Sequence, residues 1–273
     1  IADPDAYGIA GREGEDFDIL VRESGSIATS GDGAHGILLV YTGGTAGNAG
    51  SVTMDGTITT TGAGADGIYL SYPAGYNGSA AGDGTIDVGG TITASGAGSS
   101  GIYAALGDQA TVSITLDDGA EINATGNDGY GIYLANGGDY GGSGTGTATA
   151  NIFIAEGARV FSRDDEAIGE GNASGGAQVI DTTLTIAGEI ARPGGSDIAV
   201  NLDTGDDTII LLPTYSVIGQ IDGGDGTDTF VLDGAAGTTG TIDLLTGNTA
   251  RAFNFEDLRK RGAGTWIISG DDV

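Results

Sequence analysis

A short motif recurs along this chain: a glycine followed by isoleucine and then by tyrosine or leucine. Its glycines are Gly36, Gly67, Gly101 and Gly131, and Gly8 belongs to a partial copy. Successive glycines, counted from Gly8, are separated by 28, 31, 34 and 30 residues. A period of 20–50 residues is the sequence signature of repeat architectures. This period constrains the fold more than any other feature of the chain.

Each copy of the motif is preceded by a second apolar anchor and by a strand-like segment. Ile27, Ile58, Ile92 and Ile122 each lie ten residues before the isoleucine of a copy. Further upstream, segments such as 112–116 alternate apolar with small polar residues, which is the strand pattern. One unit therefore contains three short strands separated by turns. It is too small to bury its own apolar face, so neighbouring units must stack and share a core.

We therefore predict an all-β fold, a parallel β-helix (β-solenoid) with about three short strands per coil. Stacking in register would place Ile58, Ile92 and Ile122 above one another at a spacing of about 4.8 Å. An open β-sandwich also suits many short strands with glycine turns. The constant ten-residue offset argues against the sandwich, because sandwich strands have no reason to repeat with one fixed spacing.

The period divides the chain into two parts. Residues 1–200 are expected to form coils of about 30 residues with inserted loops. From residue 201 to 273 we expect a continuation with shorter coils, because residues 204–210 match residues 225–231 at a separation of 21 positions.

Composition and charge exclude several classes of protein. The chain has 38 acidic against 9 basic residues, a net charge of -29, and residues 23–158 contain no lysine or arginine, which excludes a sequence-independent nucleic-acid binder. No cysteine is present, so disulfides cannot hold the fold together. Hydrophobic residues make up 39% but aromatic residues only 6%, which predicts a core of small and β-branched side chains.

Two insertions carry the candidate binding residues. Residues 71–84, with Tyr72 and Tyr76, and residues 135–150, with Tyr140, each follow a motif copy at the same corner of the unit. Stacking would place both loops along one edge of the solenoid, where such proteins commonly bind their partners. Tyrosines on glycine-rich loops can stack on sugars or protein surfaces. The alternative is that these loops are tolerated decoration. By contrast, Tyr69, Tyr103 and Tyr133 share one repeat position, which predicts an aromatic stack along the solenoid.

An acidic glycine-rich stretch at residues 223–231 matches the nonapeptide whose turns bind Ca²⁺ in stacked repeats. Such sites take oxygen ligands from adjacent turns. If a Ca²⁺ cofactor were bound here, its ligands would be Asp225 and Asp228, with Asp206 and Asp207 on the neighbouring coil. The alternative is a corner turn in which aspartate only accommodates the backbone.

Catalytic signatures are weak. His35 is the single histidine, and it occupies a variable turn position, which disfavours a histidine-dependent hydrolase. A glycosidase needs two carboxylates at a defined separation, and acidic residues occur on most units. Basic residues on the middle units are confined to Arg159, Arg163 and Arg192. An enzyme of the carbohydrate-active β-helix type therefore remains an alternative.

The C-terminal part also resembles a known family. The stretch from Gly223 to Leu232, the segment Phe253-Asn254-Phe255-Glu256-Asp257-Leu258 and the segment Gly262-Ala263-Gly264-Thr265-Trp266 are similar to the end of passenger domains of Gram-negative autotransporters of the pertactin-like kind. The upstream repeats resemble passenger coils more loosely. The resemblance implies a right-handed β-helix, exposure on the outer cell surface, and attachment to an outer-membrane β-barrel that is not present in this chain, as in a fragment or a processed form.

These observations lead to three functional hypotheses. We expect a secreted or surface-displayed, non-catalytic, adhesin-like stalk that presents its loops to a protein or glycan ligand. The first alternative is a carbohydrate-active β-helix enzyme, either a polysaccharide lyase or a glycosidase. The second is a structural surface protein that assembles end to end, because open solenoid ends are unpaired strand edges.

Overall fold

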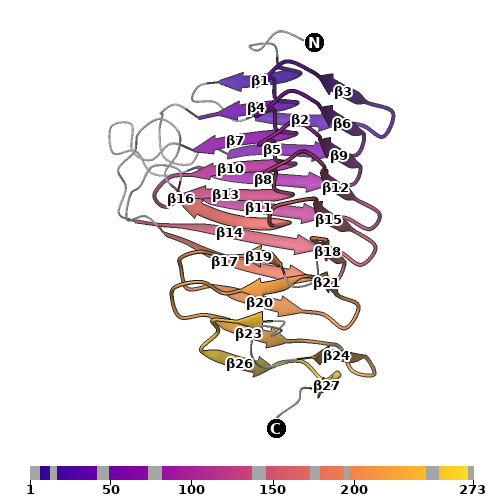
Figure 1. Cartoon of the computed structure of the whole chain (residues 1–273), viewed down its shortest axis with the longest axis vertical. Helices are drawn as coiled ribbons and strands as arrows, with labels where there is room; N and C mark the ends of the chain where they lie inside the picture. Colours follow the sequence, from indigo (N-terminus) through magenta and orange to yellow (C-terminus); the bar gives the residue numbers. More distant parts are fainter. Residues whose placement is uncertain are drawn as a thin grey trace.

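The computed structural model describes residues 7–12, 17–41, 49–72, 82–136, 146–172, 179–193, 197–243 and 252–269. These residues form 27 β-strands, which wind into a right-handed parallel β-helix with about three strands per coil (Figure 1). The predicted fold class is therefore confirmed. The described residues contain no helix of a length and apolarity that could cross a membrane.

Three parallel sheets run along the long axis; sheets A and B take one strand from each of nine coils, and sheet C takes one from each of the first seven. Sheet A contains β1 (Ile9–Arg12), β4 (Ile37–Val40), β7 (Ile68–Tyr72), β10 (Ile102–Leu106), β13 (Ile132–Asn136), β16 (Ile168–Asn172), β19 (Ile198–Asn201), β22 (Gln220–Asp222) and β25 (Ala252–Phe253). Sheet B contains β2 (Phe17–Val21), β5 (Ala49–Met54), β8 (Asp83–Val88), β11 (Thr111–Leu116), β14 (Thr147–Ile154), β17 (Val179–Ile186), β20 (Thr208–Leu211), β23 (Thr229–Leu232) and β26 (Asp257–Lys260). Sheet C contains β3 (Ser26–Thr29), β6 (Thr57–Thr60), β9 (Thr91–Ala94), β12 (Glu121–Ala124), β15 (Arg159–Ser162), β18 (Glu189–Ala191) and β21 (Ser216–Ile218).

Equivalent residues of successive coils stack in register. Ile58 pairs with Ile92 and Ile92 with Ile122, and all three side chains are fully buried. The same column continues upward to Ile27 and downward through Val160. The predicted isoleucine column is therefore confirmed. The core is one continuous, mainly aliphatic cluster that extends through the coils, so each coil buries its apolar face against its neighbours.

The motif glycines are required because an isoleucine side chain and a backbone carbonyl of the next coil approach them closely, and not because of a turn conformation. A Cβ added to Gly101 would lie 2.2 Å from the Ile122 Cγ2 atom and 2.7 Å from the Gly131 carbonyl oxygen. The left-handed backbone conformation occurs at a different turn of the coil, at Gly64 and Gly98. In the next coil, Asp128 occupies the equivalent position and has a φ of 54°. The motif therefore keeps its glycine because the isoleucine of the next coil packs directly on its Cα atom.

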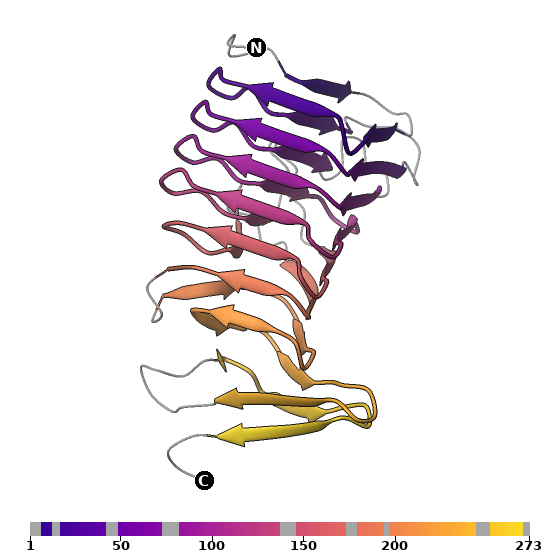
Figure 2. The same cartoon turned by 90° about the vertical axis from the view of Figure 1, so that its right-hand side faces the viewer.

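The shorter coil predicted after residue 200 occurs once in the described chain. Ile209 pairs with Phe230, 21 positions later, whereas Phe230 pairs with Leu258, 28 positions later. Sheet C ends at the same place. Its last strand is β21, and the corresponding strands of the two following coils, β24 (Thr239–Asp243) and β27 (Thr265–Ser269), form a separate two-stranded sheet. Figure 2 shows this as a wider separation below the regular stack. Sheets A and B continue across the break.

Candidate functional site

An aromatic column runs along the outer face of sheet A. The rings of Tyr69 and Tyr103 lie parallel, with centroids 5.0 Å apart, and Tyr103 lies 5.4 Å from Tyr133. The column extends to His35, whose ring is 4.6 Å from Tyr69, and ends at Tyr130, which is 4.4 Å from Tyr133. The predicted tyrosine stack is therefore confirmed. Because the rings of the stack cover one another's faces, the column contributes to stability along the axis of the solenoid.

The column ends because the following coil has no side chain at this position. Tyr133 pairs with Gly169 on β16. A Cβ on Gly169 would lie 2.7 Å from the Tyr130 ring, and a Cβ on Gly171 would lie 2.2 Å from the Tyr133 hydroxyl. The two glycines therefore form a bare stretch of backbone that the last two tyrosine rings cover.

His35 is a structural member of this column. Its Nδ1 atom accepts a hydrogen bond from the Asp66 backbone N–H at 3.0 Å, so this nitrogen carries no proton. The Asp66 carboxylate in turn accepts a bond from the Ser100 N–H at 2.6 Å. The Nδ1 atom also lies 3.3 Å from the Asp66 carboxylate, so His35 and Asp66 connect the equivalent turns of two adjacent coils.

The structure corrects the prediction that Tyr72 is an exposed loop residue. Tyr72 is the last residue of β7 and only 4% exposed. Its ring stacks on Tyr41 at 4.5 Å, and its hydroxyl donates to the Asp83 carbonyl at 2.9 Å. Packing and this hydrogen bond hold the ring against the solenoid, so it is not available to a ligand. Tyr76 and Tyr140 lie outside the described residues.

The points from which both predicted loops leave are in register. Tyr72 at the end of β7 and Asn136 at the end of β13 both pair with Leu106. The chain enters sheet B again at Asp83 and at Thr147, respectively. The two insertions therefore begin at one corner of the coil, two coils apart, as the sequence predicts.

The predicted Ca²⁺ ligands are not assembled into a metal site. Among the described residues, no three carboxylates are arranged so that they could hold a metal ion. Asp206 accepts the Thr227 N–H at 3.0 Å, and Asp228 accepts the Asp207 N–H at 2.8 Å. Asp225 instead pairs with Thr204 through an isolated bridge. In this structure the carboxylates of Asp206, Asp207 and Asp228 accept hydrogen bonds from backbone N–H groups of neighbouring coils, and Ca²⁺ binding at these turns stays a prediction.

The aspartate carboxylates form two columns of hydrogen bonds, one to N–H groups of the following coil and one to N–H groups of the preceding coil. In one, Asp181 accepts the Asp206 N–H and Asp206 accepts the Thr227 N–H, so each carboxylate bonds the next coil. In the other, Asp207 accepts the Thr182 N–H at 2.6 Å, so the carboxylate bonds the preceding coil. The acidic turns therefore tie coils together, in the manner of side-chain caps.

A buried acidic group replaces part of the apolar core beside these turns. Glu170 pairs in register with Leu134, points into the solenoid and is 7% exposed. Its carboxylate accepts a hydrogen bond from the Thr182 hydroxyl. Burial, together with the nearby Asp207 carboxylate, raises the pKa of Glu170 well above its usual range. Burial and the neighbouring Asp228 also raise the pKa of Asp207 to about 8, although the Thr182 N–H opposes that shift.

A second acidic group lies at the surface beside Tyr130. Arg192 approaches Glu166 at 3.5 Å and donates to the carbonyls of Ile198 and Asp164, at 2.8 Å and 2.7 Å. Burial and the adjacent Asp165 raise the pKa of Glu166 to about 7, and Arg192 offsets this shift only in part. A carboxyl group of this kind exchanges its proton near neutral pH.

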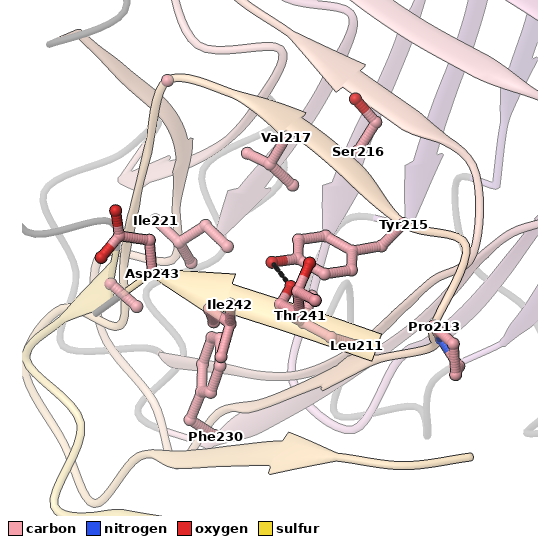
Figure 3. Close-up of a pocket in the computed structure, with 12 residues that line it drawn as sticks. Leu211, Pro213, Tyr215, Ser216, Val217, Ile221, Phe230, Thr241, Ile242 and Asp243 are labelled. Carbon is pink, nitrogen blue, oxygen red and sulfur yellow. Dashed lines mark hydrogen bonds between the residues drawn. The ribbon is translucent and has the colours of Figure 1, made fainter. Parts of the chain in front are cut away.

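The break in sheet C opens a cleft of about 310 Å³ between β21 and β24 (Figure 3). Its apolar lining includes Val217, Ile221, Phe230 and Ile242. The Tyr215 side chain extends into it, and its hydroxyl donates to the Thr241 carbonyl at 3.0 Å. No sequence feature indicates this cleft, since residues 211–243 carry ordinary strand patterns.

Searches of protein-family models, of curated proteins and of solved structures find no significant match to this chain. The fold is therefore described from the coordinates of this chain alone, and no relative indicates its function.

Proposed function

We propose that the chain is a non-catalytic stalk and binding module, displayed outside a Gram-negative cell in the manner of an autotransporter passenger. The observation that carries this proposal is the continuous strand pairing of sheets A and B, each with nine strands. Solenoids stacked in this way are rigid rods that present extended surfaces to partners. A rod of this kind holds a binding segment at a distance from its anchor.

The ligand-contacting role in this proposal belongs to the insertions that follow β7 and β13. Their anchor points lie at one corner, two coils apart, so a single extended ligand can reach both. Tyr76 and Tyr140 are the aromatic side chains that they contain. The confirmed tyrosine column supports the adjacent face of sheet A, because Tyr69, Tyr103 and Tyr133 stack there. Two weak contacts on one rigid body reinforce each other through effective concentration.

The surface location follows from the resemblance of the C-terminal segments to passenger domains. A cysteine-free chain with a net charge of -29 suits secretion as an unfolded polypeptide and solubility outside the cell. In this proposal the partner in the outer membrane is a β-barrel supplied by another segment or chain, and the ligand is a protein or glycan surface.

The test compares the purified protein with the variants Tyr76→Ala and Tyr140→Ala on arrays of glycans and extracellular-matrix proteins. We expect selective binding to a small set of ligands, a loss of about tenfold in each variant, and a larger loss in the double variant. Tyr103→Ala, in the stacked column, serves as the matched control, because it removes a tyrosine that this proposal does not assign to the ligand. Binding that is insensitive to Tyr76 and Tyr140, or equally sensitive to Tyr103, would contradict the proposal.

A specific observation also favours the carbohydrate-active enzyme as a second candidate. Glu166 has a pKa of about 7 and lies beside Asp165 and Arg192, a combination suited to general acid–base work on an acidic sugar. If this candidate is correct, a panel of polysaccharides will include one that is cleaved with a pH dependence near 7. The variant Glu166→Gln would abolish that cleavage. A panel without any cleaved polysaccharide would leave the binding module as the better proposal.

A further inference from the structure

The break in sheet C has the form of a vacant strand position. Seven strands from β3 to β21 stack in one sheet, and the next two, β24 and β27, pair only with each other. On either side of the break the other two sheets remain paired: β20 bonds β23, and β22 bonds β25. The coils therefore separate only along sheet C, where Figure 2 shows the wider gap.

The edge of β21 faces this gap with backbone groups that a strand could bond. The Ser216 N–H donates to Gly188, and the Ile218 carbonyl accepts from Arg192, so both residues bond toward β18. In a parallel ladder alternate residues bond to opposite neighbours. The N–H and C=O of Val217 therefore point toward β24, and among the described strands none pairs with β21 on that side.

The opposite edge is already bonded by a side chain in place of a strand. The Thr241 carbonyl on β24 accepts the Tyr215 hydroxyl at 3.0 Å, and Figure 3 shows the tyrosine side chain extending across the cleft to reach it. This hydroxyl satisfies one group of the edge, and a strand that displaced it would supply an N–H in its place. Tyr215 therefore acts as a removable substitute for one strand hydrogen bond.

The interior of the cleft prescribes the side chains of an occupant. Val217 continues the inward column of sheet C, which contains only isoleucine and valine from Ile27 onward. Below it lie Ile221, Phe230 and Ile242, around a volume of about 310 Å³. One β-branched aliphatic side chain that points inward would extend the column into this space. Residues on either side of it would point outward and can be polar.

Charge selects among peptides that fit this pattern. Asp243 lines the cleft, and none of the ion pairs among the described residues involves it. The whole chain carries a net charge of -29. A peptide with a basic residue next to its polar–aliphatic–polar core is therefore favoured over an acidic one.

We propose that the cleft between β21 and β24 binds an extended peptide strand of polar–aliphatic–polar pattern with a basic end, which completes sheet C by β-augmentation. Main-chain hydrogen bonds to Val217 and Thr241 would supply affinity, and the aliphatic pocket would supply specificity. This site is independent of the loops after β7 and β13. Its failure would leave the proposed stalk function intact, and the reverse also holds.

The probe is a fluorescent peptide that copies Gly90 and the β9 strand Thr91–Ala94 of sheet C and ends in an added lysine. Its affinity for the full chain is measured by fluorescence polarisation against a peptide of the same sequence that is N-methylated at its isoleucine. We expect saturable binding of the first peptide and binding at least about tenfold weaker for the second, because N-methylation removes a strand donor and keeps the side chains. Equal binding of the two peptides, or no binding of the first, overturns the proposal.

Substitutions in the protein locate the site. Val217→Pro removes the edge N–H and should weaken binding about tenfold or more, whereas Val217→Ala at the same position keeps the N–H and should weaken it about threefold or less. Ile242→Trp fills the cleft and should abolish binding, which keeps the test decisive if the proline variant does not fold. Tyr215→Phe frees the Thr241 carbonyl and should tighten binding about threefold.

Retained affinity in Ile242→Trp overturns the proposal. Concentration-dependent dimerisation that Ile242→Trp abolishes would assign the cleft to a second copy of the chain instead, and would also overturn it.

Discussion

The coils before and after β16 use the same backbone ladder but differ in what fills it. Before β16, one inward position of sheet A carries Leu39, Leu70, Ala104 and Leu134, which pair in register. At β16 the same position is Glu170, which bonds a buried threonine. One coil further, sheet C breaks and a cleft opens. The pairing of backbone strands therefore continues through a coil in which a buried glutamate replaces an aliphatic side chain.

The difference shows which interactions set the register and which set the stability. Backbone pairing in sheets A and B is maintained through every coil, so the register does not depend on an aliphatic side chain at each position. The aspartate columns add bonds between coils where the apolar filling is reduced, as between Asp207 and Thr182. We therefore expect the coils before β16 to be more stable than those after it, since nearest-neighbour terms add along a solenoid.

The largest expected effect contrasts two isoleucines. Ile122→Ala empties part of the fully buried column between Ile92 and Val160, and we expect it to lower the free energy of unfolding by about 2–5 kcal/mol. Ile242→Ala, beside the existing cleft, should cost less, because the cavity term is smaller where the packing is already open. Chemical denaturation followed by circular dichroism measures both. Equal losses would show that the two regions are equally well packed.

The sequence predicted the regular region well because its signal is periodic. The spacing of Ile58, Ile92 and Ile122 specified both the fold and the column, and the shared position of Tyr69, Tyr103 and Tyr133 specified the stack. The same alignment contained a signal for Glu170, which stands two residues after Ile168 where Leu134 follows Ile132. Because Ala167 stands where the other copies have glycine, this segment lacks the glycine that marks the motif, and the glutamate is not apparent from the motif alone.

Other features could not be read from the sequence. Tyr72 is buried because β7 runs as far as this residue and Tyr41 stacks on it, and both depend on contacts between coils. Asp206 and Asp207 have the residue types of Ca²⁺ ligands, but their orientation toward backbone N–H groups is a property of the stacked turns. The break after β21 depends on how two adjacent coils separate, and no residue pattern marks it.

The buried carboxyl groups of Asp207 and Glu170 should make the stability of the protein depend on pH. The folded pKa of Asp207, about 8, lies above the usual value near 4, so the folded state keeps a proton that the unfolded state releases. The contribution of this group is therefore most favourable below about pH 4 and is lost as the pH rises to about 8. The raised pKa of Glu170 acts in the same direction. Thermal melting between pH 5 and pH 8.5 should show stability falling with pH.

Glu170→Leu makes this test specific. The substitution restores the side chain found at Leu134 and removes a buried ionisable group, and we expect the free energy of unfolding at pH 8 to rise by about 1–4 kcal/mol. The dependence on pH should become shallower, and Glu170→Gln should show the same flattening without the added apolar packing. If the wild-type protein and Glu170→Leu respond identically to pH, the titrating group lies elsewhere.

The smallest predicted effect separates the two kinds of glycine within the regular region. Gly101→Ala would place a Cβ 2.2 Å from the Ile122 side chain and 2.7 Å from a backbone carbonyl oxygen, so we expect a loss of about 1–3 kcal/mol from overpacking. Gly98→Asn is the matched control, because a Cβ there meets no atom within 4 Å and Asp128 already adopts the same left-handed conformation one coil further. Asparagine tolerates this conformation, so its cost should stay below about 1 kcal/mol. Both variants are compared by thermal and chemical denaturation. A control that is as destabilised as Gly101→Ala would mean that turn conformation, rather than the contact with the isoleucine of the next coil, fixes the glycine of the repeated motif.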